Sequence, residues 1–449
     1  MSRVRKLSPH LFKSPLVGFH TLDSFPRFPA LESKPLDRTQ ALTGVGTDSS
    51  GNIYVVSTFA GTSIRKFSPS GSLLWHLKGL SFIDVAVADP SSDGLDLYTK
   101  HQHFTMDYNQ QPGHEWSWAG MLKNKFKYPT DPYLTLLSGG NSPVALRNIK
   151  GRKYLFTTDM YSRSLSIYRI EGETAVPSGM IAPIQPADAT AQLANFGVNS
   201  WLPGIAPQGS SFIWRDSNGN GNVDADEFSG VTGEETGIWG WDIDDQGNIW
   251  QTVEAYQGVR EFAMQGVDSA GNLIYDRAHL AVYGVPSPFT QIERVHYDSG
   301  NDVMYLSGYT AAHPIAGGMW GQAGTEIARY DNWTKGNRNP RWRITLPYDV
   351  AANRTVKAIS VAGGCVFASV WQSGLHENVY VYGSGTGAGV GLLTPGPQVG
   401  SNMGWVEGSY NLRAFQRANG EYLVFVTDEA WNKILMYRVS APAAPLQAR

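Results

Sequence analysis

Residues 47–55 read TDSSGNIYV and residues 242–250 read DIDDQGNIW, and these two stretches decide the fold. In both, an aspartate is followed by a turn that contains Gly-Asn and then by isoleucine and an aromatic residue. A run that carries an arginine and ends in phenylalanine follows each stretch, at residues 64–67 and 258–262. Because Gly and Asn favour turns, and Ile and aromatic residues favour strands, each stretch predicts a β-hairpin with a third strand beyond it.

Weaker copies of this order recur along the chain and bring the number of units to seven, at a spacing of roughly 40 to 60 residues. They occupy the ranges 83–116, 142–169, 292–342, 356–381 and 412–439. A unit of three or four short strands cannot bury both of its faces alone, so it must pack on its neighbours. The repeat therefore predicts an all-β fold, a single seven-bladed β-propeller. A pair of β-sandwiches is the alternative.

The propeller is expected over residues 41–440, with an N-terminal extension over 1–40 and a C-terminal tail over 441–449. The range 412–439 is strongly β-like. The run Leu16–Leu22 could add a strand to that last blade and so close the ring by pairing the two chain ends.

Two longer segments carry a family resemblance. The segments DSSGNIYVVSTFAGTSIRKFSPSGSLLW, residues 48–75, and DDQGNIWQTVEAYQGVREFAMQGVDSAGNLIY, residues 244–275, resemble NHL-type repeats. They are also similar to the repeats of SMP-30/gluconolactonase-like propellers. The resemblance implies the propeller fold. It does not imply lactonase activity, because the acidic metal-site pattern of that family does not map onto this chain.

Residues 216–227 read DSNGNGNVDADE and have the spacing of an EF-hand calcium loop. Gly221 at position 6 permits the sharp central turn. A strand-like run precedes the loop, so we expect it to be set into a β-scaffold, where Ca²⁺ stabilises the structure. The alternative is an Asn/Gly-rich surface turn without an ion. The expected calcium ligands are Asp216, Asn218, Asn220, Asn222, Asp224 and Glu227.

The loops between the second and third strands of all units fall on one face of a propeller, and here they are rich in histidine, aromatic and acidic residues. We expect the functional site on this face. The catalytic candidates, as acid–base groups and a charge-neutralising arginine, are His103, His313, His376, Tyr161 and Arg163. The candidates for substrate binding are Tyr256, Tyr309, Trp371 and Glu254.

Histidines on the same loops could bind a second divalent metal, Zn, Fe, Cu or Mn, because neutral imidazole is a good ligand for these ions. Asp159 or Glu254 could complete the shell. The candidate ligands are His101, His103, His313 and His376. The alternative is that each histidine is a hydrogen-bonding loop residue that never meets the others.

We therefore expect a calcium-stabilised enzyme, a metal-assisted lyase or hydrolase acting on a carbohydrate or other polar small molecule. The alternative is a non-catalytic propeller that binds a carbohydrate or a protein. The net charge of −3 argues against a nucleic-acid partner. No apolar run of about 18 residues exists, so no membrane span is expected.

A monomer is expected. The first residues are basic but lack the apolar core of a signal peptide, and a chain whose leader had been removed would look the same. We expect an extracellular or periplasmic location, with the cytoplasm as the alternative.

Overall fold

The computed structural model describes most of the chain between residues 42 and 440. The described residues are 42–57, 63–78, 85–124, 127–128, 130–131, 142–158, 162, 164–183, 207, 210–233, 235–254, 257–317, 322–372, 378–395, 410–428 and 433–440. In these ranges the backbone forms β-strands and one short 3-10 helix, Pro90–Ser92, so the fold is all-β. None of these segments is a helix long and apolar enough to cross a membrane.

The chain divides into two compact units. The first comprises residues 1–81 and 108–115. Its described strands form one antiparallel sheet in the order β1-β2-β3-β4. They are β1 Leu42–Thr47, β2 Ile53–Ser57, β3 Ser63–Phe67 and β4 Leu73–Lys78.

The second unit comprises residues 82–107 and 116–449, and its described strands form six larger sheets, each an antiparallel run of strands in chain order. The first of these sheets holds β5 Val87–Ala88, β6 Asp96–Tyr98, β7 Gln102–Met106 and β8 Trp116–Met121. The next has six strands: β9 Ser142–Ile149, β10 Arg152–Thr158, β11 Leu165–Glu171, β12 Thr174–Ala182, β13 Ser210–Arg215 and β14 Phe228–Gly233. The following sheet holds β15 Ile238–Ile243, β16 Ile249–Val253, β17 Gly258–Phe262 and β20 Leu280–Gly284, and a small hairpin pairs β18 Gly266–Val267 with β19 Leu273–Ile274.

The last three sheets repeat the same order. One holds β21 Phe289–Asp298, β22 Val303–Thr310, β23 Glu326–Asp331 and β24 Trp342–Thr345. Another holds β25 Arg354–Ala362, β26 Cys365–Gln372, β27 Asn378–Gly383 and β28 Gly389–Leu393. The last has three described strands: β29 Leu412–Gln416, β30 Tyr422–Asp428 and β31 Lys433–Val439.

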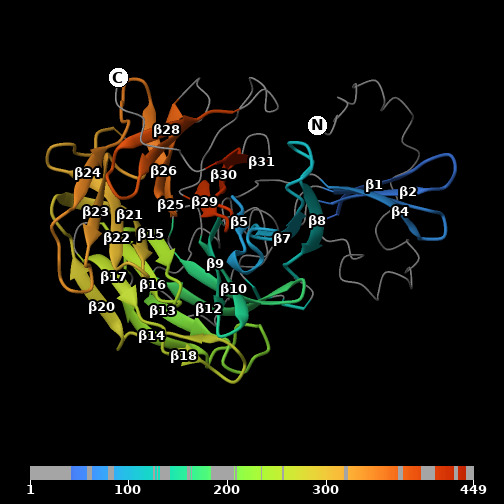
Figure 1. Ribbon diagram of the computed structural model, residues 1–449. Coiled ribbons are helices and arrows are strands. Elements are labelled where there is room, and N and C mark those ends of the chain that lie inside the picture. The colour runs from blue at the N-terminus through green and yellow to red at the C-terminus, as the bar shows by residue number, and fades with distance from the viewer. Residues whose placement is uncertain are drawn as a thin grey trace. The chain divides into compact units, whose positions relative to one another are not determined.

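The first strands of these six sheets contact one another in a closed ring. β5 contacts β9, β9 contacts β15, β15 contacts β21, β21 contacts β25, β25 contacts β29, and β29 contacts β5. The ring can be followed by colour in Figure 1, from β5 in blue to β29 in red. Antiparallel sheets that meet at their first strands around an axis are the arrangement of a β-propeller. Unit 2 therefore has a propeller-type fold.

The repeated motif forms because one aspartate side chain organises the whole turn. Asp244 Oδ1 accepts the backbone N–H groups of Gln246 and Asn248, both at 2.9 Å, and its Oδ2 accepts the indole N–H of Trp250 at 3.1 Å. Gly247 supplies the positive φ of 89° at the tip. In unit 1, Asp48 makes the same bonds, including one from the Tyr54 hydroxyl at 3.1 Å. The aromatic residue after Gly-Asn-Ile is thus part of the turn.

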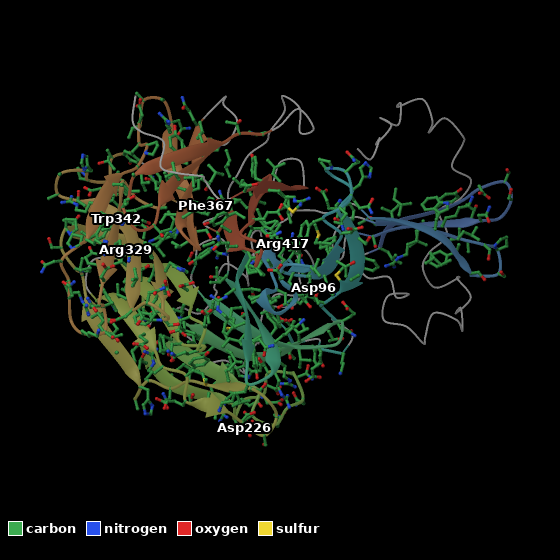
Figure 2. All side chains as sticks on the ribbon, in the orientation of Figure 1. Asp96, Asp226, Arg329, Trp342, Phe367 and Arg417 are labelled. Carbon is green, nitrogen blue, oxygen red and sulfur yellow. The ribbon has the colours of Figure 1, made fainter. Side chains whose placement is uncertain are left out.

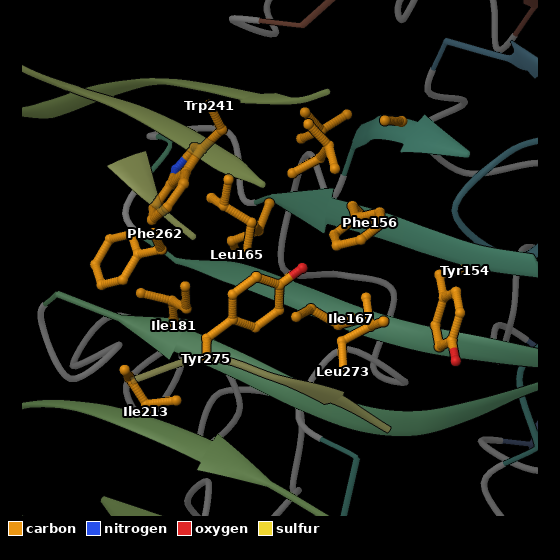
Figure 3. Packing of buried hydrophobic residues seen from close by; sticks show 14 of the residues in the cluster. Tyr154, Phe156, Leu165, Ile167, Ile181, Ile213, Trp241, Phe262, Leu273 and Tyr275 are labelled. Atoms are coloured by element: carbon orange, nitrogen blue, oxygen red, sulfur yellow. The ribbon is translucent and has the colours of Figure 1, made fainter. Parts of the chain in front are cut away.

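Buried side chains fill the space between successive sheets. The cluster in Figure 3 joins Phe156 and Ile167 of the second sheet in the ring to Trp241 and Phe262 of the third. Trp241 also donates its indole N–H to the backbone oxygen of Ser162 at 2.7 Å. Because each cluster belongs to two sheets, neither sheet could bury its faces alone.

The prediction of an all-β, propeller-type fold is confirmed, but seven blades are not. Six sheets form the ring, and the strongly repeat-like segment 48–75 lies in the other unit. The turn that contains Asp and Gly-Asn is formed by a few neighbouring residues and occurs in both units. The number of such turns therefore does not give the number of sheets in the ring. The segments 1–40 and 441–449 and the run Leu16–Leu22 lie outside the described residues, and the domain boundaries at 41 and 440 stay a prediction.

Candidate functional site

Two glutamates of unit 2 are joined by one glutamine side chain. Gln291 Nε2 donates to Glu254 Oε1 at 3.2 Å and to Glu293 Oε1 at 2.8 Å. The two carboxylate oxygens are therefore at most about 6 Å apart. Glu254 follows β16 directly, and its carbonyl accepts the N–H of Ile292 in β21 at 3.1 Å. Glu254 is partly exposed, whereas Glu293 is buried. This carboxylate pair, Glu254 and Glu293, is the candidate active site.

A β-bulge turns Glu293 toward its partner. The pairing of β21 with β22 shifts register between Ile292 and Arg294, so Glu293 is the extra residue. Two glycines leave room for this bulge. A Cβ at Gly308 would lie 2.1 Å from the carbonyl oxygen of Gln291, and one at Gly240 would lie 2.8 Å from that of Glu293. Any larger residue at these two positions would displace the backbone that carries the pair.

Both carboxyl groups hold their protons more tightly than usual. Burial raises the pKa of Glu293 to about 7; the nearby guanidinium of Arg294 opposes this rise and the charge of Glu254 adds to it. Burial also raises the pKa of Glu254, against hydrogen bonds from Trp239 and Gln291. Two neighbouring carboxyl groups with raised pKa values are what an acid–base site requires.

Glu254 was among the residues predicted to bind substrate, and the remaining members of that set lie in different surroundings. Tyr309 of β22 is buried and donates its hydroxyl to the side-chain oxygen of Gln322. Trp371, at the end of β26, is partly exposed, and Lys357 Nζ lies 5.4 Å from the centre of its ring. Tyr256 lies outside the described residues.

Each described histidine of the predicted face has its own carboxylate or cationic neighbours. His103 is held from both ring nitrogens, by Asp96 at 2.8 Å and Glu173 at 3.0 Å, with Asp96 labelled in Figure 2. His313 Nδ1 lies 2.8 Å from Glu326 Oε1, and the side chain of His313 is 46% exposed. A half-exposed imidazole on a buried carboxylate is a second possible proton acceptor.

His101 is buried, and burial holds its pKa well below the usual value, with Lys100 and Lys123 adding to the effect. Among the residues described, no three histidine, cysteine, aspartate or glutamate side chains are grouped closely enough to hold a metal ion. His101, His103 and His313 are therefore not brought together. His376, Tyr161, Arg163 and Asp159 lie outside the described residues, so the second metal centre stays a prediction.

The loop 216–227 lies between strands β13 and β14, as expected for a loop set into a β-scaffold. Its backbone is curled by side-chain oxygens: Asp216 Oδ1 accepts the N–H of Gly221 at 3.0 Å, and Asn218 Oδ1 accepts that of Asn220 at 2.9 Å. Asp224 Oδ2 accepts the amide groups of Asn218 and Asn220, both at 2.8 Å. The three carboxylates of the loop, Asp216, Asp224 and Glu227, are described but not grouped closely enough to hold an ion, so calcium binding stays a prediction.

The buried guanidinium group of Arg169 lies at the start of this loop. Arg169 Nη1 lies 2.9 Å from Asp216 Oδ2, and neither side chain is more than 5% exposed. Arg169 also donates to the carbonyl of Gly219 at 3.2 Å and to Glu171 at 2.8 Å. The charge of Asp216 is thus compensated by the protein itself. Asn222 accepts a hydrogen bond from Thr130 at 3.1 Å, and Glu227 accepts one from the indole of Trp214 at 2.9 Å.

Glu293 and Gln291 were missed because the sequence analysis placed the site only on loops between second and third strands. Both belong to a first strand, and the face that Glu293 takes depends on a bulge that strict alternation does not reveal. The available signal was an acidic residue between the apolar residues Ile292 and Val295 of β21, next to an arginine. Buried charged residues of this kind are rare without a functional or pairing reason.

Comparisons with known proteins give weak similarity. No family model and no curated protein matches the sequence. Among solved structures, a Bacteroides fragilis protein assigned as a 6-phosphogluconolactonase is 13% identical, with 89% of this chain and 94% of that chain covered and a TM-score of 0.33. Apo AztD from Citrobacter koseri is 9% identical, with 88% and 96% covered and a TM-score of 0.35. Chaetomium thermophilum Sqt1, bound to the N-terminus of ribosomal protein L10, is 10% identical, with 87% and 81% covered and a TM-score of 0.33. At such low scores no activity or partner is transferred to this chain.

Proposed function

We propose that this protein is a hydrolase or lyase that acts on a carbohydrate or other polar small molecule by acid–base catalysis at Glu254. The observation that carries the proposal is the single amide of Gln291 that holds Glu254 and Glu293 together. Glu254 is the partly exposed member, so it is the group that meets the substrate. It gives its proton to a leaving oxygen, or takes one from water or from a substrate carbon.

Glu293 is the positioning residue of this site. It is buried behind Glu254, and its charge state changes near neutral pH. Electrostatic coupling between two carboxyl groups is mutual, so a proton on Glu293 lets Glu254 ionise more readily. The protonation state of Glu293 thereby adjusts how readily Glu254 gives up its proton. Trp371, partly exposed at the end of β26, offers an aromatic surface for a sugar ring.

The test is turnover of a panel of p-nitrophenyl glycosides and sugar esters, together with uronate polymers whose cleavage creates an absorbing double bond. Glu254→Gln should reduce kcat by roughly 10²-fold to 10⁴-fold, the usual worth of a general acid or base. Glu293→Gln should instead move the pH profile of kcat/KM. Glu261→Gln is the matched control, because Glu261 also has a pKa raised by burial but pairs with Tyr283.

The result that would count against catalysis is a panel with no turnover combined with saturable binding of the same sugars that survives Glu254→Gln. That outcome would favour the second candidate, a non-catalytic propeller that binds a carbohydrate or protein. The variants Glu254→Gln and Glu293→Gln change carboxyl groups alone. They therefore do not test a metal-assisted reaction at the histidines.

We also propose that the loop 216–227 binds Ca²⁺ in a stabilising role, in a monomeric protein outside the cytoplasm. The support is its donor set: the carboxylates of Asp216, Asp224 and Glu227, and the asparagine side chains gathered on Asp224. Addition of EGTA should lower the melting temperature, and Asp224→Ala should abolish that response. An unchanged melting temperature would mean that Arg169 and the hydrogen bonds of the loop are sufficient without an ion.

A further inference from the structure

A cavity of about 110 Å³ lies within the ring of first strands in unit 2. It is lined by residues from β9, β15, β21, β25 and β29, among them Arg147, Arg294, Arg413, Asp242 and His296. A cavity of about 150 Å³ is known to admit benzene, so the space is sufficient for a small tetrahedral ion with water. Three arginines and one aspartate are among the residues that line this arginine cavity, which gives its wall an excess of positive charge.

The three arginines are fixed in place by neutral backbone groups. Arg147 Nε donates to the carbonyl of Asp244 at 3.2 Å, Arg294 Nη1 to that of Trp239 at 2.8 Å, and Arg413 Nε to that of Pro143 at 3.2 Å. Carbonyl groups orient a guanidinium but leave its full charge. The donors are therefore pre-organised for an anion, which keeps the entropy lost on binding small.

The one carboxylate of the wall, Asp242, offsets only part of this positive charge. Asp242 Oδ2 is engaged by His296 Nδ1 at 3.1 Å and by the N–H of Tyr297 at 2.9 Å. Arg413 has no ion-pair partner in the part of the chain that the structure describes, and its Nη2 is buried without a hydrogen-bond partner there. A buried donor of this kind is costly unless a ligand or water completes it.

The carboxylates next to the other two arginines are weak partners. Arg147 has Asp245 at 3.6 Å, but the Asp245 side chain is 86% exposed. Arg294 has Glu293 at 4.0 Å, the carboxyl group whose pKa is about 7.

Arg413 and Arg294 both lie close to the ring of Tyr410. The ring of Tyr410 is 4.8 Å from the guanidinium carbon of Arg413 and 5.8 Å from that of Arg294. Burial lowers the pKa of Arg413 to about 10, with the charges of Arg147 and Arg294 contributing against the opposing effects of Tyr410 and Asp242. An anion in the cavity would remove this mutual repulsion.

We propose that the arginine cavity binds a small tetrahedral oxyanion of the phosphate or sulfate class, with Arg413 as the principal donor. Guanidinium groups match such oxygens by paired N–H donors, and the size of the cavity excludes large anions. The site is built from side chains other than Glu254 and Gln291, so it stands whether or not the proposed acid–base chemistry does.

The test is calorimetric titration of the whole protein with inorganic phosphate and with sulfate at millimolar concentration, against chloride at equal ionic strength. Low concentration matters because these salts stabilise proteins non-specifically when concentrated. Wild-type protein should bind one anion, and Arg413→Gln should weaken binding by about 10-fold to 100-fold, the usual effect of losing charge-assisted hydrogen bonds. Arg438→Gln, which removes a cation paired with Glu421 on the last sheet, should bind like wild type.

A second measurement uses wild-type protein alone and covers the case in which Arg413→Gln fails to fold. Phosphate should slow modification of Arg413 by phenylglyoxal, read by peptide mass spectrometry, and should leave Arg438 unaffected. The proposal is overturned if wild-type protein takes up neither anion, if bound anion leaves Arg413 unprotected, or if Arg413→Gln binds as tightly as wild type.

Discussion

Replacing Glu293 by glutamine should remove a defined part of the pH dependence of stability. The buried carboxyl has a pKa of about 7 in the folded protein, against an ordinary value of 4.5. A carboxyl whose pKa is higher when folded binds its proton more tightly in the folded state, so its stabilising effect is complete below pH 4.5. The effect is lost as the pH rises toward 7 and beyond. The shift corresponds to about 3 kcal/mol of unfolding free energy.

The glutamine variant cannot titrate, and its amide keeps the size of the carboxyl group. Its stability relative to wild type should therefore rise by about 3 kcal/mol between pH about 4.5 and pH about 8. Urea unfolding followed by tryptophan fluorescence suits the measurement, because the chain has 14 tryptophans. The quantity compared is the difference in unfolding free energy between the variant and wild type. Unit 1 is the same in both proteins, so its unfolding contributes equally to both and cancels in this difference.

Glu421→Gln is the control, because folding shifts the pKa of Glu421 in the opposite direction from that of Glu293. Burial works against ionisation of Glu421, but hydrogen bonds from Arg438 and Arg417 outweigh it and lower its pKa. Its contribution is complete above the ordinary pKa, so the difference between this variant and wild type should not vary over the same pH range. The reasoning would be refuted if the unfolding free energies of wild type and Glu293→Gln changed with pH in parallel. Such a result would mean that the pKa of Glu293 in the folded protein is close to its value in the unfolded chain.

Two further variants test the supports of the loop and of the site. Arg169→Met should cost about 3 to 5 kcal/mol in urea unfolding, because it leaves the carboxylate of Asp216 buried and unpaired. A loss below about 1 kcal/mol would show that another group or ion compensates this charge. Gly308→Ala should cost roughly 1 to 3 kcal/mol and reduce the pH dependence assigned to Glu293, because its Cβ would press on the bulge. Gly391→Ala is the control, with its nearest neighbour at an ordinary 3.9 Å; equal losses for both glycines would contradict the steric argument.

The sequence predicted the local part of the fold well, because the signals there are local. The side chain of Asp244 accepts its hydrogen bonds from residues two to six positions ahead of it, so the turn can be read from nine letters. The membership of the ring depends instead on contacts between β5 and β29, which are separated by most of the chain. Nothing in a repeat unit records which neighbour it packs against. That is why the repeats predicted a propeller-type fold correctly, whereas the seven blades counted from them are not confirmed.

The candidate site divides in the same way. Glu254 was found because it follows a recognisable strand and turns out to meet the start of the next sheet. The histidines were grouped by the expectation that similar loops converge, whereas His103 and His313 each contact separate carboxylates, Asp96 and Glu326. Convergence is a property of three-dimensional packing, and residue type alone does not measure it. Glu293 was missed since its direction depends on one extra residue in β21.

That extra residue also explains how one strand can serve two sites. In a regular strand, adjacent side chains point to opposite faces, so Glu293 and Arg294 would be well separated. Instead, Glu293 Oε2 lies 4.0 Å from Arg294 Nη1, and both side chains are buried. The bulge brings the carboxyl to Gln291 and Glu254 while Arg294 lines the arginine cavity. An anion bound beside Arg294 would weaken the cationic effect that lowers the pKa of Glu293, so that pKa should rise when phosphate is bound. Sulfate keeps its charge over this pH range, whereas phosphate itself titrates near pH 7, so sulfate is the probe for this coupling. The sulfate affinity of wild-type protein should vary with pH near 7 and that of Glu293→Gln should vary less, and an equal dependence in the two proteins would separate the two sites energetically.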